Sequence, residues 1–288
     1  MKNLKNKDYL IDLEYLKDLK TLNNKIVLAP MAGITDAEFC KKFSNFGIVC
    51  IGAYNLDPET LKASFEIEKR GRKEFNIPLD KFSNYIKNEI KEIKESQNSK
   101  NSLVSTNIRF KDLDLYSNPH LIDNLQSVIG NSDIIEFNCH CRQPEITKLG
   151  LGQELITKKE IKELIKILKF IQGLNIKKIP LFIKIRANYI SSKELIDNFN
   201  ESKIIDYIDG IHIDCFNPGH NYPDLEYLKE LRQKFPELII IGNNSVKSEN
   251  DAKKMLEYCD FVSVARCVLA NNIEWIENFN KNNIKNKN

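Results

Sequence analysis

The chain has 288 residues, 42% of them hydrophobic, which is enough for one large domain with a sizeable apolar core. Its 43 basic residues against 40 acidic ones give a net charge of only +3, so charge alone neither shows nor excludes RNA binding. The charged first residues and the lack of any run near ~20 apolar residues predict a cytoplasmic protein without a signal peptide or membrane span.

Eight short runs rich in Ile, Val and Leu recur along the chain, separated by helical patterns. Such runs are typical of parallel strands, which are buried on both faces and joined by crossover helices. Eight units predict a closed (β/α)8 TIM barrel over residues 25–272. The expected strands are Ile26–Leu28, Ile48–Ile51, Leu103–Ile108, Ile134–Phe137, Leu181–Ile185, Gly210–Ile213, Leu238–Ile241 and Phe261–Val264. The expected helices include Asp36–Phe46, Thr157–Phe170, Leu225–Lys234 and Ser248–Leu256.

Three segments fall outside this alternation. Residues 1–24 form an N-terminal extension. Residues 57–101 are too long for one crossover, so we interpret them as an inserted helical excursion with a mobile turn. In residues 273–288 we expect a terminal helix around Ile273–Phe279 and a frayed Lys/Asn tail.

The seven cysteines are odd in number and irregularly spaced, which indicates reduced thiols rather than a disulfide framework. Cys139, His140 and Cys141 form a cluster that could suggest a metal. However, no second pair stands at ligand spacing, and adjacent residues of a strand point to opposite faces. We therefore predict no metal site.

Reactive side chains follow the fourth expected strand, in the stretch NCHCR at residues 138–142. In α/β folds, chemistry lies just past the carboxyl ends of strands, because the strand is rigid and its exit loop faces solvent. A thiol with a pKa near ~8.5 is mostly protonated at neutral pH and can act as a general acid. Cys139 and Cys141 are the two thiols of this stretch, although most cysteines are simply small hydrophobic residues.

Other strand ends carry charge or small residues. Strand alternation puts Lys184 and Arg186 on one face, and a buried lysine needs either an anionic ligand or a structural ion pair. The loops after the seventh and eighth strands of barrels often bind phosphate, and Arg266 supplies a forked cation there. Residues 29–36, APMAGITD, let the backbone pass close to a flat ligand, or simply cap the next helix.

The stretch LAPMAGITD resembles the first-strand signature of the tRNA-dihydrouridine synthase family, flavoproteins built on a (β/α)8 barrel. Later strand ends are similar to the family's motifs in the same order, and the resemblance covers roughly Lys25 to Ala270. FNCHC is similar to Asn-x-Gly-Cys-Pro, FIKIR to Val-Lys-Ile-Arg, and GIHID to Val-His-Gly-Arg. GNN and ARC are similar to Gly-Asn-Gly and Gly-Arg-Gly, which hold the FMN phosphate in the family.

The resemblance implies FMN as cofactor, NAD(P)H as electron donor and Cys141 as the catalytic acid, with Cys139 as the fallback. Asn107 stands where the family has an amide that bonds the flavin ring, although a polar residue capping a strand is an equal interpretation. His212 matches a flavin-binding histidine, although a lone histidine is more often structural. The implied cofactor-binding residues are Pro30, Met31, Ala32, Asn107, Asn138, Lys184, His212, Gly242, Asn243, Ala265 and Arg266.

The chain departs from the family's motifs at several positions. His140 and Arg142 replace the Gly and Pro around the catalytic Cys, and this changes the surroundings of the thiol. The other departures replace glycines, and at one position an arginine, of the later motifs: Asp214, Cys215, Asn244, Ala265 and Cys267. Arg142 and Arg186 are the candidate substrate contacts.

The resemblance implies reduction of the C5=C6 bond of uridine in tRNA. Members acting on tRNA carry a helical domain after the barrel, and here the chain ends soon after the eighth strand. The excursion at 57–101 is a candidate substitute, through Lys62, Lys69, Arg70, Arg72 and Lys73, although such a helix is usually a solvated face. One alternative is an FMN oxidoreductase acting on a small pyrimidine, similar to dihydroorotate dehydrogenase. Another is a barrel that binds flavin or RNA without turnover.

Overall fold

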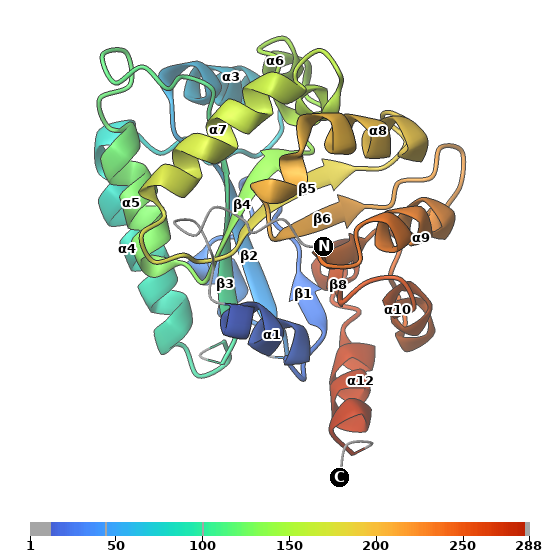
Figure 1. The fold of residues 1–288 in the computed structure, drawn as a ribbon. Helices are drawn as coiled ribbons and strands as arrows, with labels where there is room; N and C mark the ends of the chain where they lie inside the picture. The colour runs from blue at the N-terminus through green and yellow to red at the C-terminus, as the bar shows by residue number, and fades with distance from the viewer. Residues whose placement is uncertain (1–12, 44, 100, 286–288) are drawn as a thin grey trace.

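The computed structural model describes residues 13–43, 45–99 and 101–285. Its eight strands run parallel, pair in chain order and close between β1 and β8, which confirms the predicted (β/α)8 barrel (Figure 1). Every expected run becomes a strand, and β2 to β7 all extend beyond the expected carboxyl ends. The strands are β1 Ile26–Leu28, β2 Ile48–Asn55, β3 Leu103–Arg109, β4 Ile134–Cys139, β5 Leu181–Arg186, β6 Gly210–Asp214, β7 Ile239–Asn243 and β8 Phe261–Val264.

Helices on the outside of the barrel follow the strands. They are α2 Ala37–Cys40, α5 Leu121–Asn131, α6 Pro144–Thr147, α7 Ile161–Leu174, α8 Ser192–Ser202, α9 Leu225–Lys234, α10 Glu249–Leu256 and α11 Arg266–Leu269. The helix expected at Asp36–Phe46 is wrong in length, because only Ala37–Cys40 is helical. The chain turns early here: Asn45 has a φ of 77°, and the Gly47 amide already donates to Ile26 O at 2.8 Å, next to the start of β2.

Helix α1 (Leu13–Thr21) covers the amino-terminal end of the barrel. Its Leu19 is buried among side chains that fill the lower interior, including Val27, Ile48, Phe182 and Phe261. Figure 1 shows α1 on the opposite side of the barrel from α3 and α6. An apolar plug at this end leaves the carboxyl-terminal end for polar side chains, as is usual in this fold.

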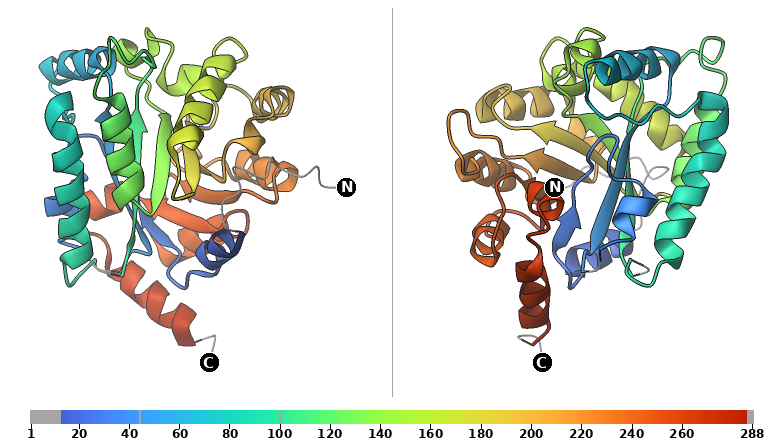
Figure 2. Two further views of the ribbon diagram at one scale, coloured as in Figure 1. Left: turned by 60° about the vertical axis from the view of Figure 1, so that its left-hand side comes forward. Right: turned by 180° about the vertical axis from the view of Figure 1, so that it is seen from behind.

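Two helices, α3 (Pro58–Lys69) and α4 (Leu79–Glu95), occupy the excursion between β2 and β3. Asp57 caps α3 by accepting from the Thr60 amide at 2.6 Å. Helix α4 buries Phe82, Ile86, Ile90 and Ile93, and it packs beside α5 (Figure 2).

We call residues 70–78, between α3 and α4, the connecting segment. It packs against the loop after β1, because a Cβ on Gly33 would come within 2.5 Å of the Glu74 amide nitrogen. Its Phe75 ring also lies 4.9 Å from the ring of Tyr54 on β2, centroid to centroid. The excursion is therefore fixed to the rim of the barrel.

Helix α12 (Glu274–Lys285) follows the barrel and buries Ile276 and Phe279. It continues beyond Phe279 into residues expected to fray, so the terminal helix is longer than the sequence indicated. The rest of the expected tail, residues 286–288, and residues 1–12 of the extension lie outside the described residues. In the part of the chain that is described, no helix is long and apolar enough to cross a membrane.

Candidate active site at the carboxyl-terminal end of the barrel

Polar side chains from five strands form one buried hydrogen-bond network inside the barrel. Glu136 on β4 accepts from Asn107 Nδ2 at 2.6 Å and bonds His212 Nδ1 at 2.7 Å. The other ring nitrogen of His212 lies 2.6 Å from Ser263 Oγ and 2.9 Å from Lys184 Nζ. Asn107 Oδ1 in turn accepts from Asn138 Nδ2 at 2.9 Å. The structure thus brings together four of the predicted cofactor-binding residues: Asn107, Asn138, Lys184 and His212.

The protonation states in this network follow from burial and charge. Burial acts to raise the pKa of Glu136, but the contacts from His212 and Lys184 outweigh it and bring the pKa to about 2. Burial lowers the pKa of His212 to about 4. Glu136 is therefore an anion and His212 is neutral at pH 7. Because Nδ1–H of His212 donates to Glu136, its Nε2 accepts from Ser263 and from Lys184.

Lys184 is 5% exposed, and burial lowers its pKa while the Glu136 carboxylate opposes that effect. An ammonium has three N–H groups. The His212 ring is its one hydrogen-bond partner among the described residues. Two N–H groups are thus left for a ligand, which suits an anionic or acceptor-rich group.

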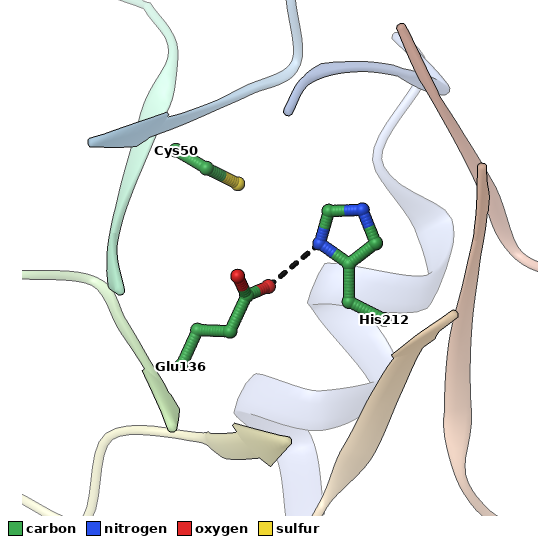
Figure 3. A group of neighbouring side chains, drawn as sticks. All are labelled: Cys50, Glu136 and His212. Carbon is green, nitrogen blue, oxygen red and sulfur yellow. Dashed lines mark hydrogen bonds and ion pairs between the residues drawn. The ribbon is translucent and has the colours of Figure 1, made fainter. Parts of the chain in front are cut away.

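Cys50, Glu136 and His212 place three potential metal ligands within 4.8 Å of one another (Figure 3). The chemistry of the group favours a hydrogen-bond network instead. Nδ1 of His212 already donates to Glu136, and the positive charge of Lys184 lies beside both groups. Burial also raises the pKa of the Cys50 thiol well above its usual value, whereas a metal binds the thiolate. The residues of this cluster therefore do not support a metal site.

A second polar cluster lies at the barrel mouth around Asp214, the last residue of β6. Its carboxylate lies 3.0 Å from His140 Nε2, and it accepts from Asn244 Nδ2 at 2.6 Å and Arg186 Nη1 at 3.2 Å. Burial raises the pKa of Asp214, but the hydrogen bond from His140 outweighs it and holds the pKa well below its usual range. His140, Asp214 and Asn244 all stand where the family's motifs have glycine, so three departures from the pattern contact one another.

The two arginines expected to contact substrate differ in their surroundings. Arg186 pairs with Asp214 and stacks on Phe216, with its guanidinium carbon 3.8 Å from the ring centroid. Arg142 is exposed and makes no hydrogen bond or ion pair with any described residue. Arg142 is therefore the arginine of the two that is free for a ligand.

The loops after β7 and β8 lie next to each other. Arg266 Nη2 is 3.5 Å from Asn244 Oδ1 and 3.4 Å from Ser245 Oγ. Asn244 and Ser245 have φ angles of 103° and 55°, conformations that glycine adopts most easily, so this loop keeps a glycine-like path without a glycine. Asn243 instead turns its amide to β8, where it donates to Ser263 O at 2.9 Å. Ala265 begins α11 at the same rim.

Gly242 is the fourth residue of β7. A Cβ at this position would come within 2.7 Å of Met255 Sδ on α10, so glycine lets α10 pack closely against the strand. Cofactor binding through the backbone of Gly242 stays a prediction.

Cys141 follows β4 in a half-buried position. Its amide donates to Asn138 Oδ1 at 3.0 Å, and its carbonyl accepts from the Gln153 amide at 3.0 Å. Gly152 allows that approach, because a Cβ there would lie 2.1 Å from Cys141 O. Cys139, the fallback acid, is fully buried in the core outside the strand layer. Cys141 is the thiol that solvent reaches.

The loop after β1 places Pro30, Met31 and Ala32 at the rim, each half-buried. Thr35 holds this turn, because its Oγ1 accepts from the Met31 amide at 2.8 Å. Asp36 caps α2 by accepting from the Phe39 amide. The helix-cap interpretation is therefore confirmed, and close passage of this backbone to a flat ligand stays a prediction.

Four residues of these clusters were not predicted from the sequence: Glu136, Ser263, Arg109 and Glu74. Glu136 sits two residues before Asn138 on β4, so strand alternation already places both on the inner face. A carboxylate inside the apolar run IIEF was the available signal. Arg109, a charged residue at the end of the buried strand β3, was a similar signal.

A family model described as "Dihydrouridine synthase (Dus)" matches residues 116–287, more than half of the chain. The match includes Cys141, Lys184, His212 and Arg266, and it begins after Asn107. An uncharacterized protein of Methanocaldococcus jannaschii, MJ0144, is 52% identical over 271 residues, which is 93% of this chain and 98% of that protein.

Among solved structures, the chain resembles the dihydroorotate dehydrogenase (DHODH) of Eimeria tenella, solved in complex with ferulenol. The TM-score is 0.61 at 14% identity, over 95% of this chain and 87% of that one. This likeness supports the barrel fold. Because the family model matches more than half of the chain, the chain belongs to the dihydrouridine synthase (Dus) family.

Proposed function

We propose that the protein is an FMN-dependent oxidoreductase that reduces the C5=C6 bond of a uracil ring in RNA. Membership of the Dus family supports this function. The observation that supports it most directly is the buried ammonium of Lys184. Two of its N–H groups have no partner among the described residues, and it lies in the barrel that also presents a solvent-accessible thiol. A cation and an acid in one mouth are what a ring reduction needs.

The residues at the mouth fit FMN by the chemistry of their donors. Lys184 has two unpaired N–H groups for the ring, and Arg266 stands beside the glycine-like loop at Asn244 and Ser245 for a phosphate. Bound FMN, reduced by a nicotinamide nucleotide, would supply the hydride for C6 of the uracil ring. The protein's residues would bind and orient the reactants.

Cys141 would hold the proton that C5 requires. Burial raises the pKa of its thiol, so the thiol keeps its proton at pH 7 until a carbanion-like carbon lies within reach. The neighbouring Asn138 fixes the backbone of Cys141 and thus the direction of the thiol. Arg142, exposed and next in sequence, would contact the substrate.

Three unpaired cations near the thiol support RNA as the substrate. Arg72 and Lys73 on the connecting segment and Arg142 after β4 are exposed, and they form no hydrogen bonds or ion pairs with described residues. Arg72 is close enough to lower the pKa of Cys141. By contrast, Lys69 pairs with Glu66, and Arg70 pairs with Glu145. The pairing argues against Lys69 and Arg70, and it leaves Lys62 on α3 as a further exposed candidate. We take Arg72 and Lys73, which lie together on the connecting segment, as the RNA contacts to test.

The substrate is tested by reducing the FMN-loaded protein without oxygen and adding unmodified tRNA transcript or orotate. We expect tRNA to reoxidise the flavin and to gain dihydrouridine, detected by mass spectrometry of the nucleosides. Reoxidation by orotate alone would contradict the RNA proposal and favour the small-pyrimidine alternative. Reoxidation by neither would favour a barrel that binds without turnover.

Removing Arg72 and Lys73 should weaken tRNA binding uniformly. Each phosphate contact contributes about one to the slope of log affinity against log salt, so Arg72→Gln/Lys73→Gln should lower that slope by about two. Binding is measured by filter retention between ~50 and ~200 mM salt. Lys166→Gln/Lys229→Gln, which removes two paired lysines on outer helices, is the control. An unchanged slope in the first variant would exclude these residues from the RNA interface.

A further inference from the structure

Arg109, the last residue of β3, is a buried cation that the proposed reaction does not use. It is 2% exposed. Its guanidinium donates from Nε to Asn55 Oδ1 at 2.7 Å and from Nη2 to Glu74 Oε2 at 2.8 Å. Its Nη1 faces Cys141 Sγ at 3.7 Å. One buried side chain therefore links β2, the connecting segment and the candidate acid.

The geometry of this contact is tightly constrained. Glu74 is 4% exposed on its side chain, so the ion pair is shielded from water on both sides. A guanidinium is planar and presents its donors in a rigid fork. With Nε and Nη2 held by Asn55 and Glu74, the direction of Nη1 toward the sulfur is set. A buried ion pair such as Arg109–Glu74 is costly to desolvate and adds little net stability. Its position beside the Cys141 thiol therefore indicates a role at that thiol.

Several groups act on the thiol of Cys141. Burial has the largest effect and raises the pKa of the thiol. Arg109 is the strongest opposing influence, followed by the hydrogen bond from the Gln143 amide and by the charge of Arg72. The carboxylate of Glu74 acts in the other direction. The groups that face the thiol thus come from β3, the connecting segment and the loop after β4.

We infer that Arg109 is a positioning residue that aims the Cys141 thiol and sets its acidity, and that the Glu74 carboxylate limits this effect. The inference rests on the proposed role of Cys141 as proton donor. When the thiol gives its proton to C5, the S–H bond breaks, a C–H bond forms with the electron pair of the carbon, and a thiolate remains. The guanidinium of Arg109 faces that thiolate until solvent returns a proton.

This arrangement also makes the excursion part of the acid's environment. The connecting segment supplies Glu74 to Arg109, and its Arg70 donates to Gln143 in the loop after β4 and to Glu145 on α6. The same segment carries Arg72 and Lys73, the proposed RNA contacts. One segment therefore contributes to both RNA binding and proton transfer.

The test is the pH dependence of alkylation of Cys141 by iodoacetamide in the free protein, followed by mass spectrometry. The reagent reports on Cys141 because the other six cysteines are buried. The thiolate is the nucleophile, so the rate at a fixed pH below the midpoint follows the pKa. Arg109→Gln should slow alkylation at pH ~8 about tenfold and move the midpoint up, whereas Arg109→Lys should stay closer to the wild type.

Glu74→Gln should have the opposite effect, because it removes the negative charge that opposes thiolate formation. We expect alkylation at pH ~8 to become several-fold faster and the midpoint to move down. Lys166→Gln, a charge loss on the outer face of α7, should match the wild type. A change of charge near the thiol moves the midpoint of the pH profile, whereas looser packing changes the plateau rate of alkylation. Comparing midpoints therefore separates the two effects.

Midpoints that stay unchanged in Arg109→Gln and Glu74→Gln, or that move in the same direction in both, would overturn the inference. If Arg109→Gln does not fold, the Glu74→Gln variant alone tests the inference. An unchanged or higher midpoint in Glu74→Gln would then overturn the inference. The measurement uses no flavin and no RNA. Failure of the proposed function therefore shows in the tRNA assay, and failure of this inference shows in the alkylation profile.

Discussion

Replacing Glu136 with leucine should lower the free energy of unfolding by about 3–5 kcal/mol, because the change leaves a buried ammonium without its anion. Glu136 and the His212 side chain are fully buried, and Lys184 is 5% exposed, so water cannot compensate. The change also leaves Asn107 Nδ2 and His212 Nδ1 without their acceptor. Urea denaturation at pH 7 measures the loss.

The loss should shrink at alkaline pH. Without Glu136, the folded protein holds the pKa of Lys184 below its unfolded value near ~10.4, so stability rises as the pH approaches that value. Glu226→Leu is the matched control, since this exposed carboxylate pairs with Lys229 on the same helix and should cost under about 0.5 kcal/mol. If Glu136→Leu lowers the free energy of unfolding by less than about 1 kcal/mol, Glu136 and Lys184 do not act as a buried ion pair.

Replacing Cys141 with alanine should slow reoxidation of the reduced flavin by tRNA about 10²–10⁴-fold, the usual contribution of a positioned general acid. Binding of FMN should be unaffected, because no predicted flavin contact is removed. Single-turnover absorbance under anaerobic conditions measures the rate.

Cys139→Ala is the control for this experiment. Its thiol neighbours Cys141 in sequence but is buried in the core on the other side of β4, so the variant should retain the rate within a few-fold. If Cys141→Ala reoxidises as fast as the wild type, another group supplies the proton. A loss confined to Cys139→Ala would move the role to the fallback residue.

The fold was predictable because parallel barrel strands carry a strong signal. Each is buried on both faces, so a short Ile/Val/Leu run identifies it even when it has only three residues, as β1 does. Helix ends were less predictable, since tertiary contacts decide them. The turn at Asn45 and Gly47 ends α2 early, and Asn280, one residue past the expected end of α12, donates to Asn45 O at 2.8 Å.

The inner face of the site was also largely predictable. Strand alternation placed Lys184 inward and required a partner for it, and that partner proved to be the His212–Glu136 pair. Contacts between distant strands could not be read from the sequence. His140 and Asp214 are 74 positions apart and Glu74 and Arg109 are 35 apart, so only the tertiary structure brings each pair together.

Three departures from the family's motifs are far apart in the sequence but lie together in the structure. In the sequence, His140, Asp214 and Asn244 are three separate replacements of glycine. In the structure, they join in one hydrogen-bonded cluster with Arg186. The three departures therefore form one local feature of the barrel mouth, in which each polar side chain has a hydrogen-bond partner.

The most direct test of the account is the visible absorption spectrum of the protein after incubation with FMN and gel filtration. We expect the wild type to retain flavin absorbance in about a 1:1 ratio to protein, and Arg266→Gln, an exposed position that should not affect folding, to bind FMN about tenfold more weakly. Lys166→Gln should match the wild type. A wild-type protein that stays colourless, or a complex whose affinity Arg266→Gln leaves unchanged, would contradict the assignment of the barrel mouth as an FMN site.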